Sequence, residues 1–300
     1  MRGKIHWRTN KHVHCAGIEI PVSESLPIAT RGDAGLDQAL AGIRPNSKKS
    51  IMLKSLAWPF TRATEEILGH QYLQHQLGKW LRRYVKPDSV FLECGPGDMS
   101  FRLFLPKGMA YNTIEFAVSE FQVHRVVKRD PAVNFCLASI TDIPVADNTC
   151  DIVACIEMLE QIPDIDKAME EIKRVAKPGA KFLCTIGNGK CEKVLRKGKN
   201  AVYANFWSDD EFQTVAERHG FKLKEHYQTG RWVPLPKWLT GRSMHLPFTS
   251  TDERYNSYFV YLYEIPKGRV AKPEEPTMPM SMVTRGMMMA GQAAELLSTV

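Results

Sequence analysis

Short apolar runs alternate with amphipathic stretches through the middle of the chain. Apolar runs without polar alternation are typical of strands that are buried on both faces of a parallel sheet. Because helical patterns lie between the runs, the sequence predicts an α/β fold with a doubly wound, mostly parallel sheet. The strands predicted for this part are 90–92, 110–116, 132–137, 150–156 and 180–186.

Amphipathic periodicity predicts the helices that would cover this sheet. Residues 164–176 have the strongest pattern, with apolar residues recurring on one face. Ser208 and Glu211 have the spacing of a capping box at the start of a later helix, and Gly220 ends that helix. Further helices are predicted over 61–84, 100–105 and 119–128, and further strands over 221–228 and 256–265.

The same patterns predict the domain organisation. Residues 1–60 have poor apolar periodicity and several prolines and glycines, which predicts an irregular N-terminal arm. Residues 61–265 form the predicted domain, and the Pro- and Met-rich stretch 266–300 is predicted to be a flexible C-terminal tail. Within the domain, 229–255 is long and has no period, so it is either a lid over a substrate or an insertion packed on the sheet edge.

A strand, a tight glycine turn and a helix are predicted in succession around Glu93. Gly95 and Gly97 allow a sharp turn and leave room for a ligand where a Cβ would stand. The following helix would direct its free N–H groups at that ligand. Ser100 stands where a dinucleotide fingerprint has its third glycine, which argues against a pyrophosphate. The carboxylate of Glu93 instead suits a ligand with a cationic amino-acid end.

A second carboxylate follows at the end of the next predicted strand. Glu115 lies 22 residues after Glu93. An acid about 20 residues beyond the glycine turn is the residue that binds ribose hydroxyls in nucleotide sites of this kind. The alternative is an acid at a strand end that only faces water. Given the glycine turn, we favour ribose binding.

Composition narrows the classes of partner and compartment. The chain has 300 residues, is 44% hydrophobic and 24% charged, and has a formal net charge of +7. Its basic residues are scattered, which favours a solvated basic surface over a nucleic-acid footprint. Seven cysteines without a CxxC pair indicate a reducing compartment, so we expect a cytoplasmic protein. No apolar stretch of about 18 residues is present, so we expect no transmembrane helix. His12, His14 and Cys15 lack a second ligand pair, so no metal site is predicted.

Four motifs in order give the stretch 88–186 a family resemblance. They are Glu93-Cys-Gly-Pro-Gly97, the acid Glu115, the segment 142–151 and the helix end 170–179. These residues resemble the core of class I S-adenosylmethionine-dependent methyltransferases, close to the type 11 group. The resemblance implies a Rossmann-like, seven-stranded sheet whose last strand is antiparallel and lies beside the fifth. It also implies S-adenosyl-L-methionine as the cofactor.

The resemblance assigns expected roles to residues around the glycine turn. Glu93 would lie near the methionine amino group, Gly95 and Gly97 under the cofactor, and Glu115 on the ribose. Ser139 and Ile140 would lie beside the adenine. Glu157, which follows the fourth strand, completes the expected cofactor site.

The sequence departs from the family pattern at three positions. Met99 replaces the third glycine, and Ser139 stands where many members have an aspartate. Gln161 replaces the usual histidine after the fourth strand, so a histidine base is absent from that position. No catalytic residue is singled out by its spacing. The candidates for a base are Glu157, Glu160, His219, His226 and His245.

Missing motifs reduce the number of possible classes of methyl acceptor. No Asp/Asn-Pro-Pro-Tyr follows the fourth strand and no Pro-Cys pair is present, which disfavours methylation of nucleic-acid bases. The sequence therefore favours methyl transfer to a small-molecule, lipid or sugar acceptor, with Tyr72, Trp232 and Arg242 on the acceptor side. A catalytically silent binding module of the same fold, an RNA methyltransferase and a dinucleotide oxidoreductase remain as alternatives.

Overall fold

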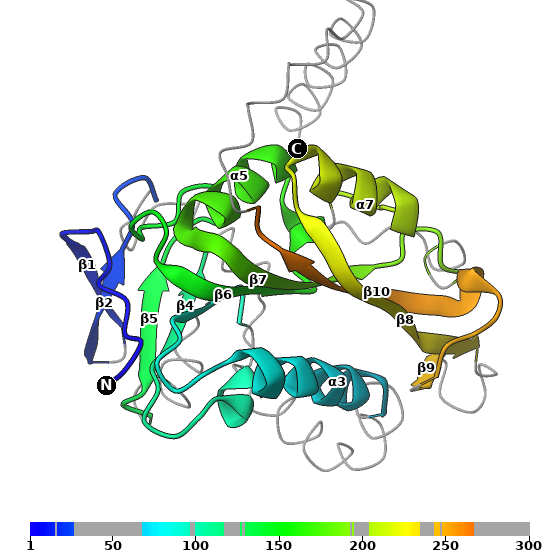
Figure 1. Cartoon of the computed structure of the whole chain (residues 1–300), viewed down its shortest axis with the longest axis horizontal. Helices are drawn as coiled ribbons and strands as arrows, with labels where there is room; N and C mark the ends of the chain where they lie inside the picture. The colour runs from blue at the N-terminus through cyan, green and yellow to red at the C-terminus, as the bar shows by residue number, and fades with distance from the viewer. Residues whose placement is uncertain are drawn as a thin grey trace, which may run out of the picture. The chain divides into compact units, whose positions relative to one another are not determined.

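A single mixed sheet forms the centre of the protein in the computed structural model (Figure 1). The structure describes residues 1–15, 17–26, 68–96, 100–116, 127, 130–192, 194, 204–234, 243–246 and 248–266. In the described residues the sheet has ten strands, in the order β1-β2-β5-β4-β3-β6-β7-β10-β8-β9.

Seven of these strands are those expected from the sequence, and they confirm the predicted fold class. Strands β3 to β7 are parallel, whereas β10 lies between β7 and β8 and is antiparallel to both. The last strand therefore lies beside the fifth, as the family resemblance implied. The seven strands are β3 (Phe91–Cys94), β4 (Tyr111–Glu115), β5 (Val133–Leu137), β6 (Cys150–Ile156), β7 (Ala176–Gly187), β8 (Lys222–Pro234) and β10 (Asn256–Glu264).

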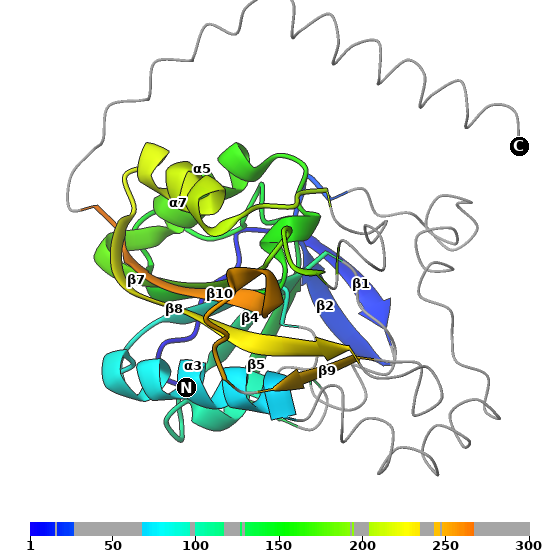
Figure 2. The ribbon, with the colours of Figure 1, turned by 90° about the vertical axis from the view of Figure 1, so that its right-hand side faces the viewer.

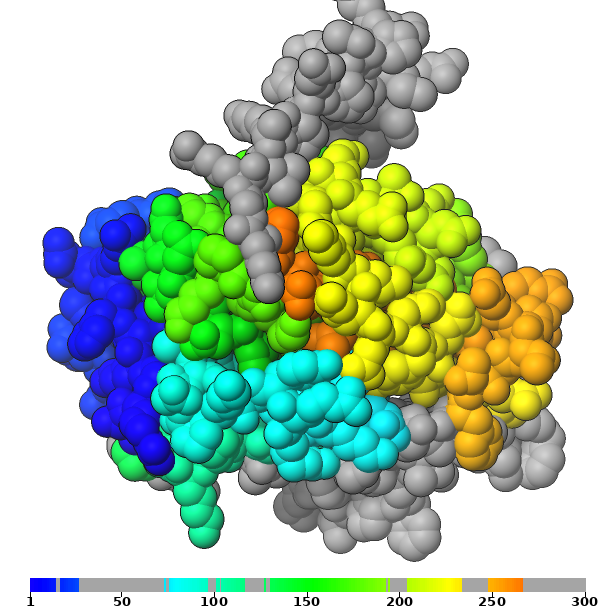
Figure 3. Space-filling model, viewed as in Figure 1, coloured from blue at the N-terminus to red at the C-terminus, as the bar shows by residue number. Residues whose placement is uncertain are grey.

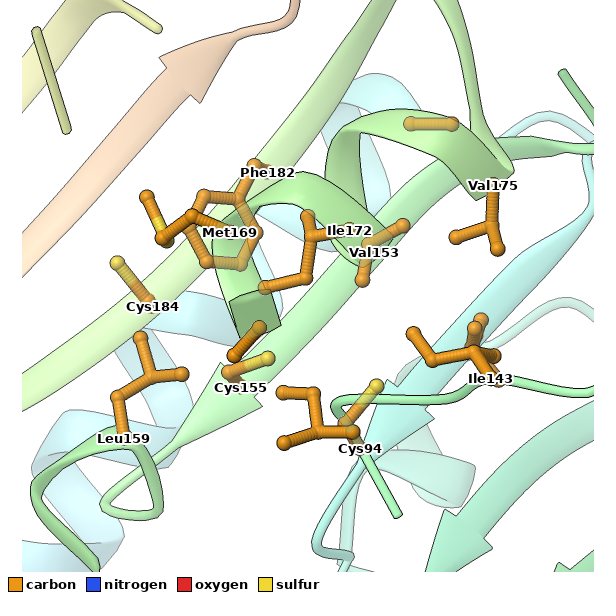
Figure 4. Packing of buried hydrophobic residues seen from close by; sticks show 14 of the residues in the cluster. Cys94, Ile143, Val153, Cys155, Leu159, Met169, Ile172, Val175, Phe182 and Cys184 are labelled. Atoms are coloured by element: carbon orange, nitrogen blue, oxygen red, sulfur yellow. The ribbon is translucent and has the colours of Figure 1, made fainter. Parts of the chain in front are cut away.

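Helices cover both faces of the sheet. Helix α3 (Leu68–Tyr84) lies on one face, and helices α5 (Ile165–Val175) and α7 (Asp209–Arg218) lie on the other (Figures 1 and 2). The α5 side of the core includes three cysteines on adjacent strands, because Cys94 pairs with Cys155 and Cys155 with Cys184 (Figure 4). Their thiols are free and buried, so they pack as small hydrophobic side chains.

The predicted starts of α5 and α7 are confirmed by their N-caps, Asp164 and Ser208. Ser208 and Glu211 form the capping box of α7. Helix α5 ends at Val175, one residue before the predicted end, and the Lys177-Pro-Gly179 stretch that follows belongs to β7. Extra residues of β7 bulge there, between the residues that pair with Cys150 and Ile152, and Gly179 takes a φ of +83°.

The N-terminal arm is not irregular throughout, which corrects the prediction for 1–60. Strands β1 (Lys11–Cys15) and β2 (Ile18–Val22) form an antiparallel pair, and β2 joins the sheet edge through the parallel pair of Val22 with Leu137. The pair is missed by pattern reading because each strand has five residues and the apolar alternation is correspondingly short. Residues 27–60 lie outside the described residues.

The predicted lid over 229–255 is also more regular than expected. Strand β8 continues to Pro234 and pairs with β9 (Ser243–Leu246), and a short 3₁₀ helix covers Glu253–Tyr255. Similarly, a 3₁₀ helix over Ser100–Phe104 replaces the helix expected after the glycine turn. The predicted helix over 119–128 and the tail 267–300 lie outside the described residues.

Candidate active site

A cavity of about 440 Å³ opens at the carboxyl edge of the parallel strands. This edge is where open α/β sheets bind their ligands, and the volume is in the range of small-molecule sites. The cavity is lined by the ends of β3, β4 and β5 and by the segment that joins β6 to α5. Its lining residues are Cys94, Gly95, Ile114, Glu115, Phe116, Ala138, Ser139, Ile140, Thr141, Met158, Gln161, Ile162, Pro163 and Asp164.

Gly95 forms the floor of the cavity where β3 ends. Its φ is +70°, a left-handed conformation that glycine adopts without strain. Its N–H donates to the carbonyl of Ile114 at 2.9 Å, which holds the turn against β4. Met158 lies directly across from it. The second glycine of the motif, Gly97, lies outside the described residues.

Glu115 and Phe116 form one side of the cavity at the end of β4. Glu115 is half-buried and accepts a hydrogen bond from the Phe116 N–H at 3.1 Å. Phe116 also lines the cavity and is 62% exposed, so much of its aromatic ring is not covered by protein atoms. Phe116 is not among the residues predicted from the sequence, although its position next to the predicted ribose acid was an available signal.

The segment after β5 forms another wall of the cavity. Ile140 is buried, and the hydroxyls of Ser139 and Thr141 lie 2.8 Å apart. The Thr141 N–H also donates to the Ser139 hydroxyl at 3.2 Å, so these residues form a closed turn. The structure thus brings together four predicted cofactor residues, namely Gly95, Glu115, Ser139 and Ile140.

The other predicted residues do not line the cavity. Glu93 is buried within the sheet and accepts a hydrogen bond from the Tyr111 hydroxyl. Glu157 has a φ of +51°, and its N–H donates to the Thr185 hydroxyl at 2.9 Å. Trp232 is also buried, on β8, and is absent from the lining. Arg242 and the side chain of Tyr72 lie outside the described residues.

The other candidate bases do not lie together. Glu160 is buried between the cavity segment and the end of β7, where it accepts a hydrogen bond from the Gly187 N–H. Burial raises the pKa of Glu160 to about 7. His219 contacts Asp166 at 2.8 Å and His226 contacts Asp209 at 3.1 Å, both on the α7 side of the sheet and away from the lining. The side chain of His245 is outside the described residues.

Neither a metal-ligand cluster nor a membrane-spanning helix is found in the part of the chain that the structure describes. That part contains no cluster of three or more histidine, cysteine, aspartate or glutamate residues that could hold a metal ion. None of its helices combines the length and apolar character that a membrane span needs.

Comparisons with known proteins match the part of the chain that carries this cavity to methyltransferases. Residues 92–184 match the type 11 methyltransferase family, which is described as a methyltransferase domain. A ubiquinone/menaquinone biosynthesis C-methyltransferase, UbiE, of Brucella abortus is 28% identical over 123 residues, which are 38% of this chain and 46% of the relative. An uncharacterized methyltransferase of Schizosaccharomyces pombe is 31% identical over 117 residues, or 35% and 42% of the two chains. This chain thus matches less than half the length of these relatives.

Two solved structures also align with part of this chain. A SAM-dependent methyltransferase from Methanosarcina mazei aligns with 63% of this chain and 98% of its own, at a TM-score of 0.48 and 16% identity. A methyltransferase solved in complex with the Haloferax volcanii Trm112 activator aligns with 67% of this chain and 97% of its own, at a TM-score of 0.49 and 16% identity.

Proposed function

We propose that the protein transfers a methyl group from S-adenosylmethionine to a small organic acceptor, because residues 92–184 match a methyltransferase domain family. The observation that carries this proposal is the cavity at the carboxyl edge of β3, β4 and β5. Its lining combines a glycine in the left-handed conformation, a strand-end carboxylate and an exposed aromatic ring.

The residues present suit the nucleoside part of this cofactor. Glu115 would accept hydrogen bonds from the ribose hydroxyls, and Phe116 would offer its ring to the adenine. Ile140 adds apolar surface to the cavity lining. Gly95 would lie beside the amino-acid end. The place where its Cβ would stand is taken by Met158, whose Cγ would be 2.6 Å away, so glycine is needed there to accommodate Met158.

The chemistry asks little of the protein beyond positioning. S-adenosylmethionine supplies an activated methyl group on a sulfonium, so transfer is a direct displacement by the acceptor. Gly95, Met158 and the segment up to Asp164 would exclude water and align the acceptor, which can lower a barrier by several kcal/mol, on the order of 7–11 at most. A base is needed only where the nucleophile is poorly ionised.

The class of methyl acceptor is inferred from missing motifs and from one relative. We favour a small molecule, lipid or sugar over nucleic acid because the motifs of base methylation are absent after β6. The similarity to UbiE supports an electron-rich ring, of the hydroquinone kind, as the first acceptor to test. A catalytically silent binding module is the alternative, since Ser139 stands where many family members have an aspartate.

The test begins with calorimetric titration of the purified protein with S-adenosylmethionine, S-adenosylhomocysteine and NAD. We expect heat with the first two ligands and none with NAD; the reverse would end the proposal. Incubation with isotopically labelled S-adenosylmethionine and a soluble hydroquinone then tests transfer by mass spectrometry. Cofactor binding without label in any offered acceptor, in a panel that also includes lipid and sugar hydroxyls, would favour the silent module.

A further inference from the structure

The cavity wall at Ser139–Thr141 is tied to the N-terminal strand pair by Asp142. Oδ2 of Asp142 accepts hydrogen bonds from the hydroxyl of Ser23, at 3.1 Å, and from that of Ser25. These partners are 119 and 117 residues away in the sequence. In Figure 3 the blue N-terminal segment packs directly against the green part of the domain at one end of the molecule.

The serines that hold Asp142 are themselves well fixed. Ser23 is 2% exposed, and its N–H donates to the carbonyl of Leu137 at 2.8 Å, at the end of β5. The Leu26 N–H donates to the Ser23 carbonyl at 3.1 Å, which closes a turn around Ser25. The hydroxyls of Ser23 and Ser25 lie 3.1 Å apart. The N-terminal segment thus presents two adjacent hydroxyl groups to one carboxylate.

Asp142 connects the two serines to the cavity wall, because it is hydrogen-bonded to both. Its N–H donates to the carbonyl of Ser139 at 3.1 Å, which closes the turn that carries Ile140 and Thr141. The next residue is secured separately by α5, because the Ile143 N–H donates to Glu171 at 2.8 Å. Loss of the Asp142 carboxylate would therefore loosen the turn at the cavity while α5 still anchors the rest of the loop.

We propose that Ser23, Ser25 and Asp142 are positioning residues for the nucleoside end of the cofactor. The inference rests on the proposed function, because it assumes that the nucleoside occupies this cavity. If the cavity wall is already ordered in the free protein, binding does not have to order it, and less conformational entropy is lost when the ligand binds. The additional strand pair at the sheet edge is in this view part of the cofactor site.

The test compares three variants by calorimetry and thermal unfolding. Asp142→Ala removes the acceptor, Asp142→Asn keeps one side-chain oxygen that can accept from a serine hydroxyl, and Glu24→Ala removes an exposed carboxylate of the same segment that does not contact Asp142. For Asp142→Ala we expect about five- to twentyfold weaker binding of S-adenosylhomocysteine, the effect of one or two hydrogen bonds. We expect near-parental binding for the other two variants and similar melting temperatures for all three.

Two further measurements separate positioning from general stability. The loss in Asp142→Ala should be equally large for 5′-methylthioadenosine, which lacks the amino-acid end, and Ser23→Ala with Ser25→Ala should reproduce it. Amide exchange of residues 139–142 without ligand should rise in Asp142→Ala. Parental affinity or unchanged exchange in Asp142→Ala would overturn the inference, as would an equal loss in Glu24→Ala. If the parent protein binds neither ligand, the proposed function fails first, and this inference fails with it.

Discussion

The Cα of Gly95 faces the side chain of Met158 so closely that a Cβ built on Gly95 would lie 2.6 Å from the Met158 Cγ and 3.2 Å from its Cβ. The two residues come from the ends of neighbouring strands, β3 and β6, and both line the cavity. The floor of the site therefore depends on a glycine for two reasons, its left-handed backbone and the position of Met158.

Gly95→Val should abolish most cofactor binding. The branched side chain resists the φ of +70° and collides with Met158, and each effect costs on the order of 1–3 kcal/mol. We expect at least about tenfold weaker binding of S-adenosylhomocysteine by calorimetry. Gly108→Val is the matched control, because Gly108 has a φ of +77° but no atom within 4 Å of its Cβ position. Equal binding losses in both variants would point to backbone strain alone.

Glu115→Ala should weaken cofactor binding while the fold is kept. The side chain is half-buried at a strand end, so its removal leaves no large void. Loss of hydrogen bonds to a charged group costs about 1.5–3 kcal/mol, or roughly ten- to a hundredfold in affinity. Titration with S-adenosylhomocysteine measures the effect, with the exposed Glu19→Ala as control. Unchanged affinity in Glu115→Ala would mean that the ribose lies elsewhere.

Glu160 should make stability fall as the pH rises through neutrality. Its pKa is raised from an ordinary value near 4.5 to about 7 by burial, so the folded state binds the proton more tightly than the unfolded state. The stabilising contribution is complete below about pH 4.5 and is lost as the pH rises through about 7. Between pH 5 and 8 the loss should be on the order of 2–3 kcal/mol.

Glu160→Gln isolates this effect, because the amide oxygen can still accept from the Gly187 N–H without becoming charged. Urea unfolding at pH 5 and pH 8 should show a smaller difference between the two pH values in this variant than in the parent. At pH 8 the variant should be the more stable of the two. A parental pH dependence in Glu160→Gln would assign the titration to another group.

Arg174 should stabilise the loop 143–147, which follows the cavity wall. Its guanidinium donates to the carbonyls of Ile143 and Val145, each at 2.7 Å, and to the carboxylates of Glu171 and Asp147. Arg174→Lys cannot serve these partners together, so we expect a loss of about 1.5–3 kcal/mol in urea unfolding. Arg254→Lys, whose carboxylate partner Asp252 lies two residues away on the surface, is the control. A parental unfolding midpoint for Arg174→Lys would contradict this prediction.

Trp232→Ala should affect stability more than acceptor binding. The indole is 3% exposed on β8, so its truncation leaves a cavity that costs about 3–5 kcal/mol. Thermal and urea unfolding measure this loss. If the variant instead keeps its stability and raises the Michaelis constant of an identified acceptor, Trp232 belongs to the acceptor site, as the sequence suggested.

Local patterns in the sequence were enough to predict the central architecture and part of the site. The apolar runs of β3 to β7 and the capping box at Ser208 depend on residues within a few positions of one another. They can therefore be predicted from the sequence alone. The same holds for the turn at Gly95 and for Glu115, since a strand end and a glycine turn are defined by neighbouring residues.

The tertiary structure alone decided which distant residues share a site. Met158 opposes Gly95 because β6 lies beside β3, and Asp142 meets Ser23 because β2 adds to the sheet edge at β5. Burial of Glu160, which shifts its pKa, depends on the end of β7 in the same way. Contacts between residues so far apart come from strand order and packing, which have no periodic signal in the sequence, whereas the elements themselves do.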